Sequence, residues 1–307
     1  MSLEKMKRTA LFLTLSLLLI LSAGCGTPPA SDESALTIRT VEDGIGRKVS
    51  LPQDVERAVS LAPNITEIAF AVGAGEKLVG VTTFCNYPAE AGEIRKVGDT
   101  LKPNIETIVA LRPQVVFVST ASQLESFTGI LDDQGIKVFV TNPESLDSVF
   151  GSMVSIGDVL GKKQEAEKVV EALEARVRKV RVITEQTTFE APQTVFVQID
   201  PSLYTVGKGS YITDLIAIAG GRSVTSDLET AYPKISKESA RAYDPRIIIL
   251  SDSPDNREPN EVFAESSAVR DGRVERINAD VLSRPGPRIV EALEQIADAI
   301  HGRKTEK

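Results

Sequence analysis

The sequence has very few of the residues on which most catalytic and metal sites depend. It contains one histidine, His301, two cysteines, Cys25 and Cys85, and no tryptophan. A Ser-His-Asp or Cys-His arrangement needs a histidine base beside its nucleophile, and His301 in the predicted last helix is better explained as a solvated surface residue. Histidine-based zinc sites are excluded for the same reason. We therefore expect neither an enzyme nor a resident metal.

Charge and cysteine content restrict the partners and the folding chemistry. The formal net charge is -8, which argues against a nucleic-acid partner. If Cys25 is modified, Cys85 has no disulfide partner and the chain must rely on sizeable apolar cores. The roughly 280 residues that follow Cys25 exceed the usual size of a single core, so two domains are the default.

The N-terminus has the organisation of an export signal. Lys5, Lys7 and Arg8 precede an apolar run over 10–21, and small residues lead to Cys25. The run is shorter than the ~20 residues of a membrane-spanning helix. Residues 22–25 resemble a bacterial lipobox, although serine stands at position 22 where leucine is usual. We expect 1–25 to be a lipoprotein signal with lipidated Cys25 and 26–36 a flexible tether; an ordinary cleaved signal with an incidental cysteine is the alternative.

An exported lipoprotein of this kind would lie in the periplasm or on the outer cell surface. Acylation by more than one chain would anchor it to a membrane, since a single chain binds only marginally. We therefore expect a membrane partner through the lipid anchor.

Two motifs occur twice in the same order. Residues 65–68, followed by Gly73, correspond to 212–215, followed by Gly220; residues 106–119 correspond to 238–251. The first motif predicts a short helix that ends at glycine. The second predicts a short helix stopped by proline and followed by an apolar strand that is buried on both faces of a parallel sheet. Chance similarity is the alternative, but duplicated α/β lobes explain both matches. Asn64 and Glu67 have capping-box spacing.

The fold class that follows is α/β, with two Rossmann-like lobes of parallel sheets joined by one long helix. We expect an N-terminal lobe over 37–160, a linking helix over 161–187 and a C-terminal lobe over 188–307. The linking segment is amphipathic and about 36 Å long, which predicts modest hinge motion. Ligands of such sheets bind beyond the carboxyl ends of the strands, here in a cleft between the lobes.

Individual strands and one further helix can also be placed. We expect a hairpin at the start of the first lobe and a helix over Ile289–His301 at the end of the second. The predicted strands are 37–41, 48–51, 58–61, 78–81, 115–119 and 138–141 in the first lobe, and 194–199, 247–251 and 274–277 in the second.

Several segments together resemble one protein family, the cobalamin and ferric-siderophore binding proteins of ABC importers. The resemblance extends from Thr37 to His301. It implies a solute-binding protein that is not an enzyme and whose partners are an ABC permease dimer and a small-molecule solute. The segments that carry it are 60–67, 82–88, 97–99, 103–113, 204–207, 219–221 and 232–238.

The resemblance also implies roles for single residues. Glu106 and Glu238 match the carboxylates, one on each lobe, that contact arginines of the permease. The alternative is that each glutamate only stabilises its own helix by interacting with the positive N-terminal end of the helix dipole. The positions that match ligand contacts are Phe84, Asn86, Tyr87, Tyr204, Tyr232, Asp280 and Arg284. For each aromatic residue the alternative is loop packing, and for Arg284 it is a solvated side chain.

The solute implied by the resemblance is a corrinoid, because 82–88 and the Asp280/Arg284 pair match the vitamin B12-binding branch most closely. Thr100 and Ser119 stand where members of that branch often have tryptophan, which predicts a pocket lined by smaller or more polar side chains. A ferric siderophore or haem is the alternative, since tyrosine and arginine can face an anionic chelate or ligate haem iron. An extracytoplasmic enzyme or an interaction module on the same scaffold is the alternative of another class. No cofactor is expected beyond the bound solute.

Overall fold

The computed structural model describes residues 37–120 and 125–302, and every structural statement below refers to them. The predicted signal (1–25), Cys25 and the tether (26–36) lie outside the described residues. Within those ranges, no helix has both the length and the apolar character needed to cross a membrane.

The first lobe begins with an antiparallel hairpin and continues as a parallel sheet. In the hairpin, β1 (Ile38–Glu42) pairs with β2 (Lys48–Pro52). The sheet has the order β4-β3-β5-β6 and is formed by β3 (Ala58–Ser60), β4 (Leu78–Val81), β5 (Val115–Ser119) and β6 (Lys137–Thr141). Successive residues of β5 enter different apolar clusters, Phe117 on one face and Val116 and Val118 on the other. Burial of both faces explains why this strand is wholly apolar up to its last residue.

Helices cover both faces of this sheet. On one face lie α2 (Pro63–Ala71) and α5 (Leu146–Val159), and on the other α3 (Ile105–Ala110) and α4 (Glu125–Asp133). Two 3₁₀ turns, η1 (Gly75–Lys77) and η2 (Ala89–Glu93), complete the lobe.

The second lobe repeats this plan. Its parallel sheet has the order β10-β9-β7-β8, with β7 (Gln193–Gln198), β8 (Gly221–Ser223), β9 (Ile247–Asp252) and β10 (Val274–Asn278). The helices are α7 (Tyr211–Ile218), α8 (Lys237–Ala242), α9 (Ser267–Arg270), α10 (Ala279–Ser283) and α11 (Ile289–His301), with the 3₁₀ turn η3 (Glu261–Phe263). Residues of α7 and α11 share a cluster with Ile247 and Ile249, whereas Ile248 and Leu250 face the opposite cluster.

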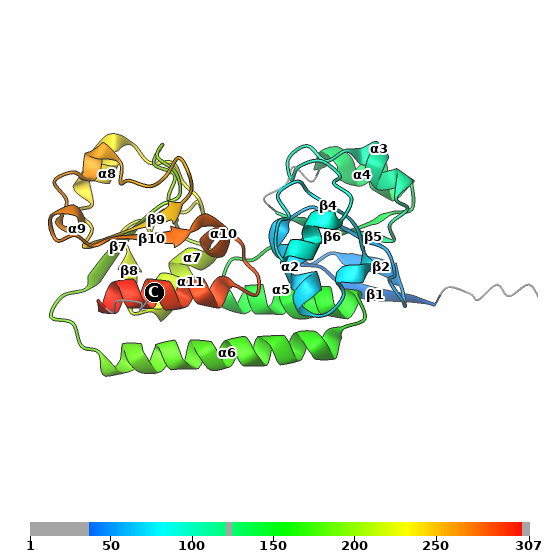
Figure 1. Ribbon diagram of the computed structural model, residues 1–307, viewed down its shortest axis with the longest axis horizontal. Helices are drawn as coiled ribbons and strands as arrows, with labels where there is room; N and C mark the ends of the chain where they lie inside the picture. The colour runs from blue at the N-terminus through cyan, green and yellow to red at the C-terminus, as the bar shows by residue number, and fades with distance from the viewer. Residues whose placement is uncertain (1–36, 121–124, 303–307) are drawn as a thin grey trace, which may run out of the picture. The chain divides into compact units, whose positions relative to one another are not determined.

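The long helix α6 (Lys163–Gln186) runs along both lobes and packs against α5 and α11 (Figure 1). It buries Leu173, Val177 and Val180 on one face. Arg176 forms a bidentate ion pair with Glu294 of α11, with N–O distances of 3.0 and 2.7 Å. The buried residues of α6 belong to one apolar cluster that contains residues of both sheets, so the two lobes share a continuous core.

The repeat found in the sequence is present in the backbone. Arg112 and Asp244, which correspond in the second motif, both have positive φ, 48° and 37°, and each precedes a proline. Gly73 and Gly220, which correspond in the first motif, have φ of 72° and 85°. A positive φ is unfavourable for residues with a side chain, so its recurrence at Arg112 and Asp244 shows that both copies adopt the same turn.

Three features of the structure differ from those expected from the sequence. The capping box does not form, because Pro63 opens α2 with Ala62 as its N-cap and no side chain caps the helix. The short strand β8 was not expected. The imidazole of His301 is not fully solvated, since its Nε2 lies 3.0 Å from the carbonyl oxygen of Ala219 and its ring lies 5.3 Å from that of Phe189.

Candidate functional site

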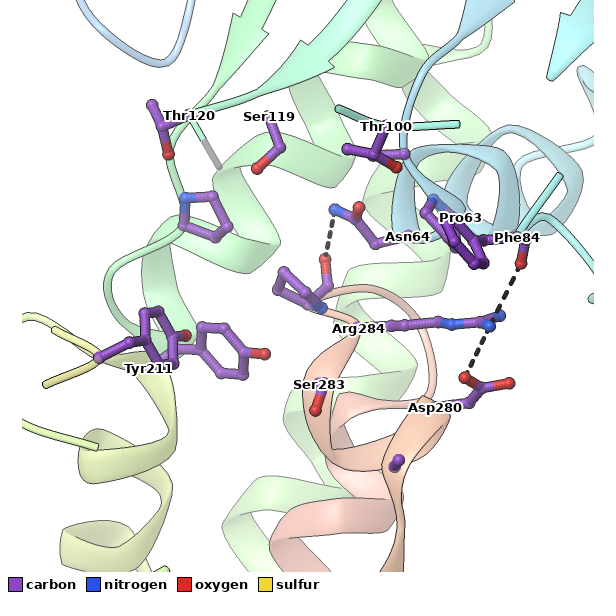
Figure 2. A pocket seen from close by; sticks show the side chains of 15 residues that line it. Pro63, Asn64, Phe84, Thr100, Ser119, Thr120, Tyr211, Asp280, Ser283 and Arg284 are labelled. Carbon is purple, nitrogen blue, oxygen red and sulfur yellow. Dashed lines mark hydrogen bonds and ion pairs between the residues drawn. The ribbon is translucent and has the colours of Figure 1, made fainter. Parts of the chain in front are cut away.

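A cavity of about 440 Å³ lies where residues of the two lobes meet (Figure 2). The first lobe contributes the start of α2 and the carboxyl end of β5, and the second contributes α10 and the segment that follows it. This is the position at which parallel α/β sheets bind ligands. The lining residues are Ala62, Pro63, Asn64, Phe84, Thr100, Ser119, Thr120 and Pro143 of the first lobe, and Tyr211, Tyr232, Ala279, Asp280, Ser283, Arg284 and Pro285 of the second.

Four of the expected ligand residues line this cavity: Phe84, Tyr232, Asp280 and Arg284. Phe84 is 57% exposed and Tyr232 is 41% exposed. Large aromatic side chains usually bury most of their surface, so two exposed rings in one cavity indicate a surface that a ligand covers.

The other three expected ligand residues do not line it. Asn86 lies behind Arg284, whose Nη1 donates to its Oδ1 at 2.8 Å. Tyr87 stacks on the guanidinium of Arg288, 4.3 Å from the ring centroid, beside a second cavity. Tyr204 lies under the ammonium group of Lys234, at 5.6 Å.

Arg284 is buried in a network that joins the lobes. Only 8% of its surface is exposed, which excludes the solvated arginine considered from the sequence. Its Nη1 lies 2.9 Å from Glu67 Oε1, and its Nη2 lies 2.7 Å from Asp280 Oδ1 and 3.3 Å from the carbonyl oxygen of Phe84. Figure 2 shows this side chain extending from the second lobe toward Phe84, with Asp280 beside it.

Glu67 is the centre of the network. It is 2% exposed and accepts from Arg288 Nη2 at 2.6 Å and Nε at 2.9 Å, in addition to Arg284. The hydrogen bonds that Arg288 donates to Glu67 raise the pKa of the Arg288 guanidinium. A buried carboxylate is tolerated only when it is paired and hydrogen-bonded, and here two arginines of the second lobe meet that requirement.

Local structure holds the network in place. Pro63 is favourable at the first position of α2, and Glu67 follows one turn later. Asn64 Nδ2 donates to the carbonyl oxygen of Pro285 across the cavity, at 3.2 Å. Asn278 caps α10 through its Oδ1, which accepts from the backbone amide of Asp280 at 2.9 Å.

Two tyrosines supply neutral hydroxyl groups at the cavity. The Tyr211 hydroxyl donates to the carbonyl oxygen of Leu282 at 3.3 Å, and burial raises its pKa well above 10.0. Tyr232 has an exposed ring, but burial of its hydroxyl end near Ser210 and Tyr211 raises its pKa as well. Both phenols therefore stay protonated at neutral pH and act as hydrogen-bond donors.

Sequence reasoning missed Asn64, Glu67 and Tyr211 as residues of the site. Glu67 carried one usable signal, since a charged residue among Ile65, Ile68 and other apolar positions of α2 is unusual unless it is paired. Tyr211 directly follows Ser210, the N-cap of α7. Nothing in the sequence indicated that it lines the cavity.

Glu106 and Glu238 lie away from the cavity, each at the second position of a six-residue helix, α3 or α8. Both are exposed, and neither forms an ion pair with a lysine or arginine within the described ranges. The hydrogen bond from its own backbone amide, followed by that of the Ser236 hydroxyl, lowers the pKa of Glu238. Both carboxylates are therefore available to a basic partner surface.

The described residues include no group of three or more histidine, cysteine, aspartate or glutamate side chains arranged to hold a metal ion. Cys85 is buried and free.

Known proteins are similar to this chain in sequence. The model of a family described as "Periplasmic binding protein" matches residues 59–281. An uncharacterised ABC transporter substrate-binding lipoprotein of Bacillus subtilis, YvrC, is 28% identical over 96% of this chain and 98% of its own length. A vitamin B12-binding protein of Vibrio cholerae is 29% identical over 80% of this chain and 89% of its own length.

Solved structures share the fold. The crystal structure of the periplasmic vitamin B12 binding protein BtuF of Vibrio cholerae matches with a TM-score of 0.70 and 26% identity, covering 83% of this chain and 100% of that one. The periplasmic heme-binding protein RhuT of Roseiflexus has the same TM-score, 0.70, at 24% identity, and covers 81% of this chain and 99% of that one. The latter likeness shows the fold alone.

Proposed function

Because the chain belongs to the periplasmic binding protein family, we propose that it captures a corrinoid outside the cytoplasm and delivers it to its importer. At the coarser level the chain is a substrate-binding protein of an ABC importer, since its relatives are solute-binding proteins and not enzymes. The proposal concerns the identity of the solute, the residues that hold it and the docking surface.

The observation that carries the proposal is the pair of exposed aromatic rings in a cavity with uncharged donors. Phe84 and Tyr232 come from different lobes and offer apolar faces to a flat macrocycle. Asn64 and Tyr232 supply an amide and a phenol group, which suit the amide-bearing rim of a corrin. Similarity to the vitamin B12-binding protein of Vibrio cholerae, at 29% identity in the sequence match and 26% in the structural match, supports the same solute.

Haem is the second candidate, because tyrosine can ligate haem iron and Tyr211 and Tyr232 both line the cavity. Ligation requires the phenolate, and burial raises the pKa of both phenols, so loss of the proton is costly here. A ferric siderophore, which carries negative charge, would favour an arginine free to pair with it. Arg284 is already engaged. The corrinoid is therefore favoured.

A panel of solutes measured by thermal unfolding tests this assignment. A ligand that binds only the folded state raises Tm, by an amount that grows with its concentration relative to Kd. We expect cyanocobalamin to raise Tm and haem and a ferric hydroxamate to leave it nearly unchanged at equal concentration. A rise with haem or the hydroxamate and none with cyanocobalamin would overturn the corrinoid assignment.

Three further features belong to the proposal. Glu106 and Glu238 dock onto arginines of the permease dimer, one from each lobe. Both are exposed and neither forms an ion pair with another described residue, which supports this. Lipidation of Cys25 anchors the protein to the membrane; the lipoprotein name of the Bacillus subtilis relative supports it. Tyr87 and Tyr204 remain candidate contacts at the rim of a larger solute, since both are about half exposed, at 49% and 40%.

A further inference from the structure

Glu67 is a buried carboxylate whose position calls for an explanation. It does not cap α2, it does not line the solute cavity, and it is 2% exposed. Among the described residues, its carboxylate accepts hydrogen bonds from two arginines of the other lobe, Arg284 and Arg288. An apolar residue at this position of α2 would avoid the burial of a charge. The free-energy cost of desolvating an ion pair often equals the gain from its Coulomb attraction.

The terminal amino groups of Arg284 are fully used. Each carries two hydrogen atoms. The Nη1 group contacts Glu67 at 2.9 Å and Asn86 at 2.8 Å, and the Nη2 group contacts Asp280 at 2.7 Å and the carbonyl oxygen of Phe84 at 3.3 Å. An anionic solute could pair with these two amino groups of Arg284 only by displacing one of these acceptors.

The charges of the network cancel. Glu67 and Asp280 each carry a negative charge, and Arg284 and Arg288 each carry a positive one. Among the described residues that line the cavity, Arg284 and Asp280 are the charged ones. The cavity therefore presents no net positive charge, and the carboxylate of Asp280, which is 41% exposed on its side chain, would repel an anion.

We propose that Glu67 sets the charge of the solute that this site accepts. It is a positioning residue: it neutralises Arg284 and Arg288 from behind the cavity wall, so that the site selects uncharged, amide-bearing solutes over anionic ones. This inference deepens the proposed function and rests on it for the identity of the solute. Without the charge of Glu67, Arg284 at the cavity wall would have an amino group free to pair with an anion such as a carboxylate.

The experiment compares two corrinoids that differ in one group. The first is cyanocobalamin, and the second is its monocarboxylate, in which one peripheral amide is hydrolysed to the acid. The readout is the ratio of the two Kd values, because a loss of packing alone would weaken both solutes together. We expect the native protein to bind the amide form about tenfold more tightly, and Glu67→Gln to reduce that preference about tenfold, the scale of one charge–charge interaction at a partly buried site.

Two further variants make the result specific. Glu90→Gln makes the same chemical change at an exposed residue near the second cavity and should leave the ratio unchanged. If Glu67→Gln does not fold, Asp280→Asn removes the other negative charge that contacts Arg284 and should shift the ratio in the same direction. An unchanged ratio in the folded variants, or a native preference for the acid, overturns the inference while the corrinoid function stands.

A failure of the function has a different signature. If neither corrinoid binds, haem and its dimethyl ester form the corresponding charged and uncharged pair. A preference of the native protein for the ester that is lost in Glu67→Gln would support the role of Glu67 in selecting uncharged solutes, and it would reject the corrinoid as the solute. Binding of neither pair would reject both.

Discussion

Tyr211 shows how burial determines the chemistry of one side chain. The residue is 4% exposed, and its hydroxyl donates to the carbonyl oxygen of Leu282 in α10. Burial raises its pKa well above 10.0, since the phenolate would lose its hydration. The residue therefore links α7 to the arginine-bearing end of the second lobe as a neutral donor.

This shift predicts a loss of stability in alkali. The folded-state pKa lies above the unfolded-state value, so the stabilisation is fully present below about pH 10 and is lost as pH rises from there toward the folded-state pKa. We expect Tm to fall between about pH 10 and 11 in the native protein and to fall less in Tyr211→Phe. Circular dichroism measures both. The exposed Tyr204→Phe is the control and should behave like the native protein; equal curves for all three would contradict the prediction.

The sequence located part of the cavity wall, while solute contact at those positions stays a prediction. Four of the seven expected ligand positions line the cavity, and Arg284 is among them. Glu67 was misjudged, because the spacing of Asn64 and Glu67 fits a capping box while its arginine partners lie more than 200 positions later, at Arg284 and Arg288. Contacts across the lobes leave no local pattern in the chain.

The short helices α3 and α8 hold corresponding carboxylates in the same local geometry. Asn104 caps α3 by accepting from the amide of Thr107 at 2.9 Å, and Ser236 caps α8 by accepting from that of Ser239 at 3.1 Å. Each cap satisfies a free amide of the first turn, where Glu106 or Glu238 is the second residue. A transporter that contacted both could sense the separation of the lobes.

We expect Glu106→Ala combined with Glu238→Ala to leave solute affinity unchanged and to reduce uptake by the cognate importer at least tenfold, because charge-assisted contacts on two lobes would be lost together. Uptake of labelled solute and calorimetric affinity are the two measurements. The control pair is Glu76→Ala with Glu265→Ala, at exposed glutamates elsewhere on the two lobes. Weakened solute binding in the first pair, or equal loss of uptake in both, would argue against docking.

Elements with a strong periodic or apolar pattern were predicted within about two residues. The linking helix expected over 161–187 is α6 (Lys163–Gln186), and the last helix was placed correctly at Ile289–His301. The strand β8 was missed because its three residues, Gly221–Ser223, have no apolar run. Pairing with β7 makes it a strand, and that pairing depends on the tertiary fold.

For the whole molecule, the continuous core supports the small hinge motion expected from the helical link. The same apolar cluster includes Phe117 of the first sheet, Ile249 of the second and Val177 of α6. Wide separation of the lobes would expose part of this shared core, which is costly. The limited opening stays a prediction.

Membrane anchoring is tested by one substitution. Cys25→Ser removes the thiol that would be acylated, and we expect the protein to move from the membrane fraction to the soluble fraction after cell disruption, since the anchor would be lost. Cys85→Ser is the matched control, because Cys85 is buried and free, and its distribution should not change. Sedimentation of Cys25→Ser with membranes would contradict lipidation.

The central claim is that the cavity between the lobes holds a corrinoid. Calorimetric titration of the native protein and of Phe84→Ala with cyanocobalamin tests it most directly. The account predicts saturable binding at one site per chain, weakened about tenfold or more in Phe84→Ala because an exposed aromatic wall is lost. No heat with cyanocobalamin, or equal affinity in the two proteins, would contradict it.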